Sequence, residues 1–232
     1  MRKFKNICLL ACALVVFSSC ELDNYDAPNV SLHGSFIDNV TGELVEQDIV
    51  GGTKIIFVER GFKNPEEQNM VVKTDGTYRN ELMFAGEYDL YFNESNFVLP
   101  DTLKRKELKQ RENKLDFIVQ PYIRITNKKI ERIGNKIVAT FSIKPTVDKK
   151  VRQVGLFAHV DYVVGDRFKL VESKQDVNAI VANETEYKLE IDLNSNNGSK
   201  LKPNKEYYFR VGALIDGNGA RYNYASAVKI TI

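Results

Sequence analysis

Apolar and polar residues alternate with a period of two along much of the chain. The alternation is clear in residues 86–92, 136–143 and 186–193. It places successive side chains on opposite faces of a strand, whereas no stretch before residue 100 keeps the 3.6-residue period of a helix. Clusters of Gly, Asn and Asp separate these runs, as turns require. The pattern therefore predicts an all-β protein made of β-sandwiches.

Two segments predict specific connections. Asp75-Gly76 follows a short β-branched strand at residues 70–73, and Asp-Gly is a strong signal for a hairpin turn. Residues 101–114 are dense in charge, with six Lys or Arg residues and with Glu107 and Glu112 interspersed. Mixed charge of this kind is typical of a solvated face, so we expect a short solvated helix or a long edge loop there.

The N-terminus has the pattern of a secretory signal. Arg2, Lys3 and Lys5 precede an apolar run at residues 7–17, which is shorter than the ~20 residues of a membrane span. The run ends in Ser18-Ser19-Cys20, which resembles the lipobox of bacterial lipoproteins. That resemblance implies cleavage before Cys20, lipidation of its thiol and anchoring in a membrane by acyl chains. The alternative is an ordinary soluble secretory signal.

Pro121 marks the expected boundary between two domains, because a proline cannot donate to a sheet ladder and belongs at a strand start or edge. The predicted organisation is a lipoprotein signal at residues 1–19, a lipidated tether at 20–29, one β-sandwich at 30–120 and a second at 121–232.

Charge and cysteine content limit the classes of partner and of fold that the chain can have. The chain has 33 Lys and Arg residues against 31 Asp and Glu residues, and the predicted cleavage removes three basic residues and leaves 30 against 31. This balance argues against a nucleic-acid partner. Cys8 and Cys12 leave with the signal, so we expect a mature fold without disulfides.

Both predicted domains resemble known families. Gly34 and Asp38 with the Thr41-Gly42-Glu43 turn, then residues 74–78 and 85–90, resemble the carboxypeptidase regulatory domain, a transthyretin-like sandwich. Leu201, Pro203 and Tyr207 resemble the fibronectin type III (immunoglobulin-like) pattern. Under that resemblance, Tyr207 is a tyrosine corner, with its ring in the core and its hydroxyl bonded to the preceding turn.

The mature chain as a whole resembles a Bacteroidota family of two-domain lipoproteins of unknown function, through residues 25–28, the Thr-Gly-Glu turn, the Asp-Gly turn and residues 120–123. Its members resemble accessory components of glycan-uptake systems. The resemblance implies an outer-membrane protein whose partners are a TonB-dependent transporter and its glycan-capturing lipoprotein, and it supplies no catalytic residue. The acidic tether after Cys20 resembles a signal for display on the cell exterior, and the alternative is a generic hydrophilic spacer.

We expect a poly- or oligosaccharide ligand, held by aromatic rings stacked on sugar faces and by polar groups that bond hydroxyls. The last inter-strand loop offers both kinds of residue at a solvent-facing tip, where sandwich domains bind ligands. The candidate residues are Asp216, Asn218, Arg221, Tyr222 and Tyr224. Two alternatives stay open: the tyrosine rings face the core, or the protein is a spacer or scaffold.

The sequence predicts no enzyme, metal site or cofactor. Its two histidines, His33 and His159, both lie in strand-like segments, and His159 with Asp161 supplies too few ligands for a closed metal site. Asp101-Thr102-Leu103 resembles the O-glycosylation tripeptide of Bacteroidota extracytoplasmic proteins.

Overall fold

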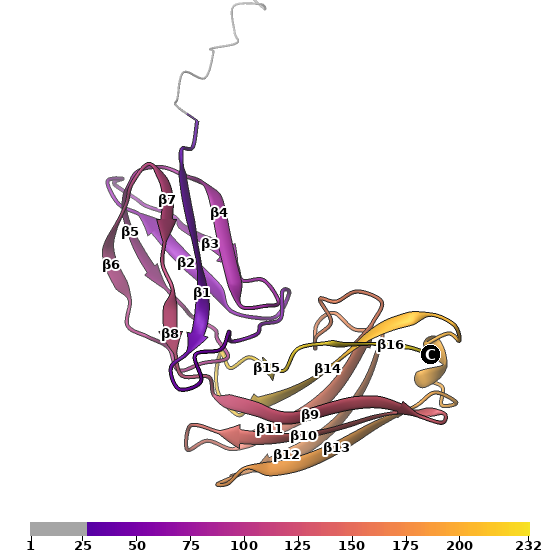
Figure 1. The fold of residues 1–232 in the computed structure, drawn as a ribbon. Helices are drawn as coiled ribbons and strands as arrows, with labels where there is room; N and C mark the ends of the chain where they lie inside the picture. Colours follow the sequence, from indigo (N-terminus) through magenta and orange to yellow (C-terminus); the bar gives the residue numbers. More distant parts are fainter. Residues whose placement is uncertain (1–26) are drawn as a thin grey trace, which may run out of the picture.

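Alternating residues form strands along the whole described chain. The computed structural model describes residues 27–232, whose strands form two β-sandwich domains, and these residues contain no α-helix (Figure 1). The prediction of an all-β protein with tandem sandwiches is confirmed. The predicted signal, Cys20 and the tether as far as residue 26 lie outside the described residues.

The N-terminal domain packs two sheets around an aromatic core. One sheet has the order β4-β1-β7, with β8 also paired to β1, and the other has the order β3-β2-β5-β6. β1 pairs antiparallel with β4 and parallel with β7 and β8. The strands are β1 (Val30–Asp38), β2 (Lys54–Glu59), β3 (Glu67–Val71), β4 (Thr77–Met83), β5 (Gly86–Tyr91), β6 (Leu103–Leu108), β7 (Arg111–Lys114) and β8 (Phe117–Val119).

The Asp75-Gly76 turn does not form the predicted hairpin. Gly76 has a φ of +82°, and its N–H donates to the Lys73 carbonyl at 2.9 Å, so the turn itself is tight. However, β3 pairs with β2 while β4 pairs with β1, so the turn carries the chain between sheets. Because the chain changes sheets at this turn, Met70 reaches the core from one sheet and Tyr78 reaches it from the other. Burial of these side chains, rather than the turn, therefore decides which strands pair.

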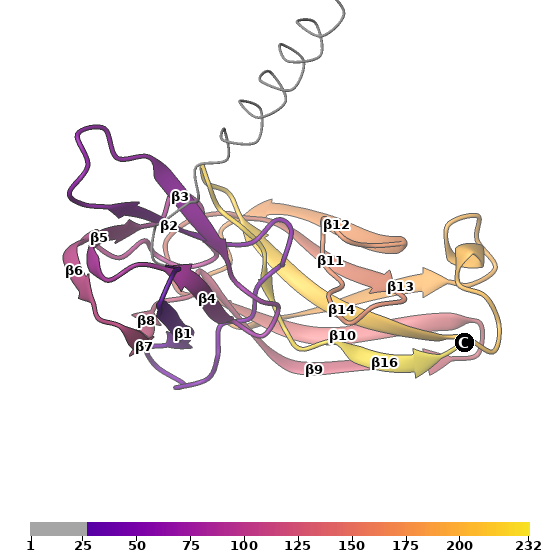
Figure 2. The same ribbon diagram turned by 90° about the horizontal axis from the view of Figure 1, so that it is seen from above.

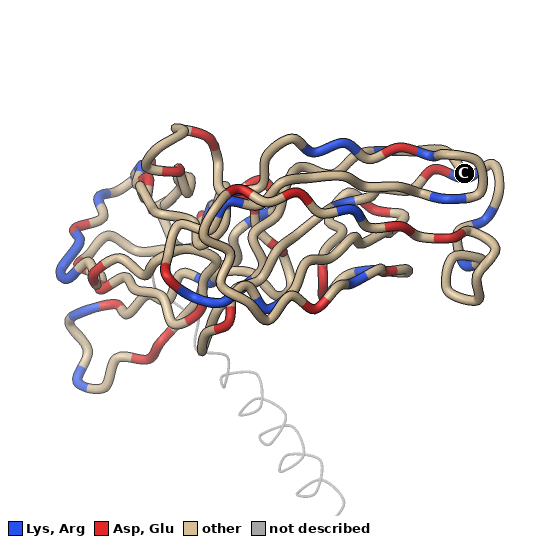
Figure 3. Tube along the Cα trace, turned by 90° about the horizontal axis from the view of Figure 1, so that it is seen from below, with Lys and Arg blue, Asp and Glu red and all other residues tan. Residues whose placement is uncertain are grey.

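Residues 101–114 form strands rather than the predicted helix or loop. β6 pairs with β5 at the edge of one sheet, and β7 pairs with β1 at the edge of the other. Their side chains are mostly charged and exposed. Charged residues at sheet edges discourage pairing with other chains, so this composition fits edge strands as well as it fits a solvated loop. Basic and acidic residues are interspersed over both domains (Figure 3).

One glycine fixes the parallel pairing of β1. A Cβ atom at Gly34 would lie 1.8 Å from the Leu115 carbonyl oxygen, at the break between β7 and β8. Only glycine allows this close approach without a backbone shift. Two residues on, Phe36 is fully buried and stacks on Phe97 and Phe117, with ring centroids 4.9 and 5.2 Å away.

The C-terminal domain is a second sandwich. Its sheets have the orders β13-β10-β9 and β12-β11-β14-β15, with β16 also paired to β14. A short 3-10 turn at Gly198–Lys200 precedes β14. The strands are β9 (Ile123–Ile133), β10 (Lys136–Pro145), β11 (Val151–His159), β12 (Val171–Ala179), β13 (Thr185–Asp192), β14 (Glu206–Ile215), β15 (Asn223–Tyr224) and β16 (Val228–Thr231).

Tyr207 has the geometry of a tyrosine corner. Its side chain is buried in the second core, and its hydroxyl accepts a hydrogen bond from the Lys202 N–H at 2.8 Å. The bond therefore links the turn before β14 to the start of that strand.

A buried polar junction joins the two domains. The N-terminal domain stands at one end of the long C-terminal sandwich, opposite the end where the chain terminates (Figure 2). At the junction, Arg210 of β14 is fully buried. Its guanidinium donates to the Gln47 carbonyl at 2.8 Å, the Glu46 Oε2 atom at 2.6 Å and the Thr74 carbonyl at 3.3 Å, all in the N-terminal domain.

Arg210 also bonds within its own domain. It donates to the Ala225 carbonyl at 2.9 Å and the Val164 carbonyl at 3.2 Å, and its guanidinium carbon lies 4.3 Å from the centroid of the Tyr224 ring. A buried charge is tolerated only when it is paired and hydrogen-bonded, and Arg210 meets both conditions.

A second pair reinforces the junction. Arg124 of β9 donates to both carboxylate oxygens of Asp38 of β1, at 2.7 and 2.8 Å. Burial of Asp38 favours the protonated acid, but the Arg124 bonds and the Val40 N–H outweigh it and hold the pKa of Asp38 below its ordinary value. Asn96 adds a neutral link: its amide donates to the Glu46 and Tyr222 carbonyls at 2.8 and 3.2 Å.

Tyr207→Phe should destabilise the C-terminal domain by about 1 kcal/mol, because the Lys202 N–H loses its acceptor while the ring stays in the core. Urea denaturation followed by circular dichroism measures this. Tyr187→Phe is the matched control, since no hydrogen bond of the Tyr187 hydroxyl occurs among the described residues. Equal stability of the Tyr207 variant and the parent would contradict the role given to this bond.

Arg210→Met should lower the free energy of unfolding by about 3 kcal/mol, because the Glu46 carboxylate and four carbonyls at the junction lose their donor. We expect differential scanning calorimetry to show the two domains melting separately, since their coupling is lost. Exposed Arg132→Met serves as the control. A single unchanged transition in the Arg210 variant would show that the domains are held together by other contacts.

Candidate functional site

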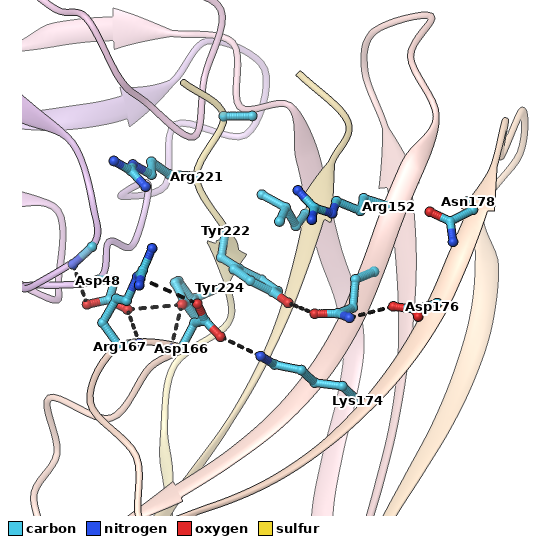
Figure 4. Close-up of a pocket in the computed structure, with 14 residues that line it drawn as sticks. Asp48, Arg152, Asp166, Arg167, Lys174, Asp176, Asn178, Arg221, Tyr222 and Tyr224 are labelled. Carbon is cyan, nitrogen blue, oxygen red and sulfur yellow. Dashed lines mark hydrogen bonds and ion pairs between the residues drawn. The ribbon is translucent and has the colours of Figure 1, made fainter. Parts of the chain in front are cut away.

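A cleft of about 620 Å³ opens where the N-terminal domain meets the outer face of the β12-β11-β14-β15 sheet. Its lining is mostly polar, and residues from both domains contribute (Figure 4). Asp48 and Gly51 come from the loop between β1 and β2. The other lining residues are Arg152, Gln153, Asp166, Arg167, Lys174, Asp176, Asn178, Leu214, Ala220, Arg221, Tyr222 and Tyr224.

A β-bulge shapes the floor of the cleft. The pairs Val151–Ile215 and Gln153–Leu214 leave Arg152 without a partner on β14. On the other side, two residues of β12 lie opposite Arg152, and one of them, Asn178, has a φ of +48°. Adjacent residues of a regular strand face opposite ways, whereas a bulge re-aims one of them. Arg152 and Gln153 can therefore both line the cleft.

A hydrogen-bonded relay fixes the polar groups of the floor. The Tyr222 hydroxyl donates to Gln153 Oε1 at 2.6 Å, and Gln153 Nε2 donates to Asp176 Oδ1 at 2.5 Å. Burial and the nearby Asp166 carboxylate raise the pKa of the Tyr222 hydroxyl, so it stays protonated and acts as a donor. The amide of Gln153 is thereby held in one orientation.

Asp48 is held equally firmly on the opposite wall. Its carboxylate accepts bonds from the N–H groups of Val50 at 2.8 Å, Gly51 at 3.0 Å and Arg167 at 3.3 Å. The Tyr224 hydroxyl donates to it at 3.2 Å and itself accepts the Asp166 N–H at 2.9 Å. Burial and the Asp48 carboxylate raise the pKa of Tyr224, so this hydroxyl is also neutral.

Asp166 is paired with Lys174, whose Nζ atom lies 2.7 Å from its Oδ1 atom. Burial is the largest single effect and favours the neutral form of each group, but the hydrogen bonds and opposite charges around each group together outweigh it, with Lys169 adding to Lys174 and Glu172 adding to Asp166. The pKa of Asp166 is therefore lowered and that of Lys174 raised. The pair is therefore charged across the neutral pH range. Lys174 also lies 2.8 Å from Glu172 Oε2, which extends the network along β12.

The structure brings three of the five predicted site residues into the cleft. Arg221, Tyr222 and Tyr224 line it, whereas Asp216 and Asn218 are exposed in the loop after β14 and are not part of its lining. The prediction that Tyr222 and Tyr224 lie at a solvent-facing loop tip is wrong, because these side chains are only 7% and 8% exposed.

Packing explains why the tyrosines are buried. Both rings lie edge-on to Phe157, with centroids 5.5 and 6.1 Å away, and together with Val164 they form a small hydrophobic cluster. Gly212 makes room for them, since a Cβ atom there would lie 2.8 Å from the Tyr224 ring and 3.1 Å from the Tyr222 ring. Their hydroxyls organise the cleft, and their ring faces are not free to stack on a sugar.

Sequence reasoning missed the rest of the lining. Asp48, Arg152, Asp166 and Lys174 are far apart in the chain and look like ordinary surface residues there. The one available signal was the alternation of Lys174, Asp176 and Asn178 on one face of a polar strand, which does not distinguish a cleft from solvent.

A second hollow of about 390 Å³ lies elsewhere on the domain junction. Lys73 and Asp75 of the N-terminal domain line it with Tyr162 and Tyr208 of the C-terminal domain. Tyr162 is 60% exposed, so this hollow offers the accessible aromatic ring that the cleft lacks.

Within residues 27–232, no group of three His, Cys, Asp or Glu side chains is placed to hold a metal ion. His159 and Asp161 are bonded through the Asp161 N–H, which donates to His159 Nδ1 at 3.0 Å. No helix in this part of the chain is long and apolar enough to cross a membrane.

Comparison with known proteins gives the family. Residues 30–120 match the family model "Protein of unknown function (DUF3823) N-terminal domain", and residues 123–229 match "Domain of unknown function (DUF3823_C)". No curated protein matches the chain.

Solved structures agree with this match. The chain is 39% identical to a protein from Bacteroides uniformis described as a candidate carbohydrate-binding protein, with a TM-score of 0.80 over 88% of this chain and 100% of that one. A DUF3823 family protein from Parabacteroides merdae is 24% identical, with a TM-score of 0.71 over 89% of this chain and 100% of that one. One from Bacteroides ovatus is also 24% identical, with a TM-score of 0.68 over 87% and 98%. The last two establish likeness of fold alone. The chain therefore belongs to the DUF3823 family, a two-domain family of unknown function.

Proposed function

We propose that this protein is a lipid-anchored outer-membrane protein that binds glycan in the interdomain cleft and assists carbohydrate acquisition without catalysing a reaction. The observation that carries the proposal is the cleft itself, an open hollow whose polar side chains are held in place by hydrogen bonds within the protein. Sugar hydroxyls both donate and accept hydrogen bonds, so a site that recognises them needs such groups in fixed positions.

The relay from Tyr222 through Gln153 to Asp176 provides this preorganisation. Asp176 and Asn178 are exposed on the β12 wall and available to sugar hydroxyls. Fixed partners reduce the ordering entropy that a ligand must overcome on binding. The similarity to the B. uniformis protein described as a candidate carbohydrate-binding protein, at 39% identity, supports the same role.

Two features of the cleft favour binding over acid-base catalysis. Asp48 is surrounded by donors from the protein, and Asp166 is held charged by Lys174 with its pKa lowered, away from neutral pH. A general acid or base works best with a pKa near the operating pH.

A structural spacer or scaffold, in contact with a TonB-dependent transporter complex or another surface protein, is the second candidate. The junction around Arg210 favours it, because three hydrogen bonds from this one buried side chain cross to the N-terminal domain and fix the angle between the domains. A fixed angle suits a protein that holds other components apart or in register.

Binding of the lipid-free chain from residue 21 to residue 232 to a panel of soluble polysaccharides, by affinity gel electrophoresis and calorimetry, tests the glycan proposal. We expect saturable binding that Asp176→Ala weakens by about tenfold, the effect of losing about 1.4 kcal/mol of polar contact. Glu186→Ala, an exposed acid on β13, should bind like the parent.

Two other results would count against the cleft. Loss of binding in Tyr162→Ala with full binding in Asp176→Ala would move the site to the second hollow. No binding to any plant, host or microbial glycan would favour the scaffold function.

Cys20→Ala should move the protein from the membrane fraction to the soluble fraction, because several acyl chains, each contributing about 0.8 kcal/mol per buried CH₂, are lost together. Protease treatment of intact cells should digest the parent protein if it is displayed on the cell exterior. Retention of the Cys20 variant in the membrane would contradict lipid anchoring.

A further inference from the structure

The acidic and basic groups of the cleft differ in how fully they are paired. Among the described residues, each cleft carboxylate has a partner within the protein: backbone N–H groups and Tyr224 for Asp48, Lys174 for Asp166, and Gln153 for Asp176. The carboxylate oxygens are thus hydrogen-bonded within the protein, although in this part of the chain only Asp166 has a cationic partner and Asp48 and Asp176 keep their charges.

The arginines are less completely paired. Within residues 27–232, no hydrogen bond or ion pair involves the exposed Arg152 side chain, and Figure 4 draws no dashed line to it. The side chain of Arg167 is 63% exposed, and its contact with Asp166, at 4.0 Å, is long. Arg221 pairs with Glu94, yet its buried Nε–H has no acceptor among the described residues.

These arginines come from separate elements. Arg152 stands on the β11 bulge, Arg167 in the loop between β11 and β12, and Arg221 in the segment before β15. The cleft is lined by four basic residues against three acidic ones, and among the basic groups the guanidinium groups of Arg152 and Arg167 are the most exposed and least paired. Guanidinium groups are matched in geometry to carboxylate and sulfate, which they bind through paired N–H donors.

We propose that the glycan held in the cleft is acidic, and that Arg152 and Arg167 bind its carboxylate or sulfate groups. The inference rests on the proposed function and names its ligand class. Arg221 is already paired with Glu94, so the two guanidinium groups free to meet a ligand charge are those of Arg152 and Arg167. The β11 bulge is then a functional feature, since it turns Arg152 to the same side as Gln153 and lets one strand supply both a charge contact and a hydroxyl contact.

Paired polysaccharides that differ only in charge test this inference with the mature lipid-free chain. Polygalacturonate against its methyl ester tests carboxylate, and dextran sulfate against dextran tests sulfate. We expect at least one acidic polymer to bind about tenfold more tightly than its neutral partner, and this preference to fall as NaCl rises from about 0.05 to about 0.5 M, since salt screens exposed charges.

Variants locate the charge contact. Arg152→Gln and Arg167→Gln should each weaken binding of the acidic polymer by about fivefold to tenfold, while Arg152→Lys should retain part of it. Arg132→Gln removes the same charge from the exposed end of β9 and should bind like the parent, which excludes a general effect of net charge. Thermal melting checks that each variant is folded.

The outcomes separate the two proposals. Equal binding of neutral and acidic polymers, with loss only in Asp176→Ala, would overturn the acidic ligand and leave the glycan-binding function standing. Equal losses in Arg152→Gln and Arg132→Gln would also overturn it, because the attraction would then be nonspecific. No binding to any polymer would overturn the glycan-binding function and the inference with it.

Discussion

The burial of Arg210 between the two domains is the interaction on which the rest of the structure depends. A guanidinium removed from water needs acceptors on every side, and here they come from both domains: Glu46, Gln47 and Thr74 on one side, Val164 and Ala225 on the other. A side chain satisfied in this way fixes the domains relative to each other, because separating them would leave buried polar groups unpaired. The cleft is a consequence, since the loop that carries Asp48 is held over the outer face of the C-terminal sheet.

Much of the fold could be predicted because strand alternation is a local property. Residues 136–143 lie within β10, and the alternating run at 186–193 lies within β13 except for its last residue. Pairing partners are not local, and the Asp75-Gly76 turn illustrates this: its local geometry is a tight turn, but the strands it joins bury their apolar faces from opposite layers. The charge of residues 101–114 correctly indicated exposure, yet exposed edge strands and solvated loops share that composition.

The site was harder to predict, for a related reason. In β14, Tyr207, Phe209 and Val211 alternate into the second core, so the same pattern assigns Arg210 to the solvent side. The N-terminal domain covers that side, and a rule based on one strand cannot foresee this burial. Tyr222 and Tyr224 are also buried on this outer face, where they pack on Phe157 beside Gly212 although a sequence pattern predicts exposure. The β11 bulge breaks the alternation that would otherwise have separated Arg152 from Gln153.

Amide hydrogen exchange of the lipid-free chain, measured by mass spectrometry with and without an acidic polysaccharide, tests most directly whether both domains build the binding site. A ligand in the cleft should slow exchange at residues 48–51 of the N-terminal domain together with residues 152–153, 166–167, 174–178 and 220–224 of the C-terminal domain. Protection confined to one domain, or centred on residues 73–75 and 160–163, would contradict a binding site built by the junction of the two.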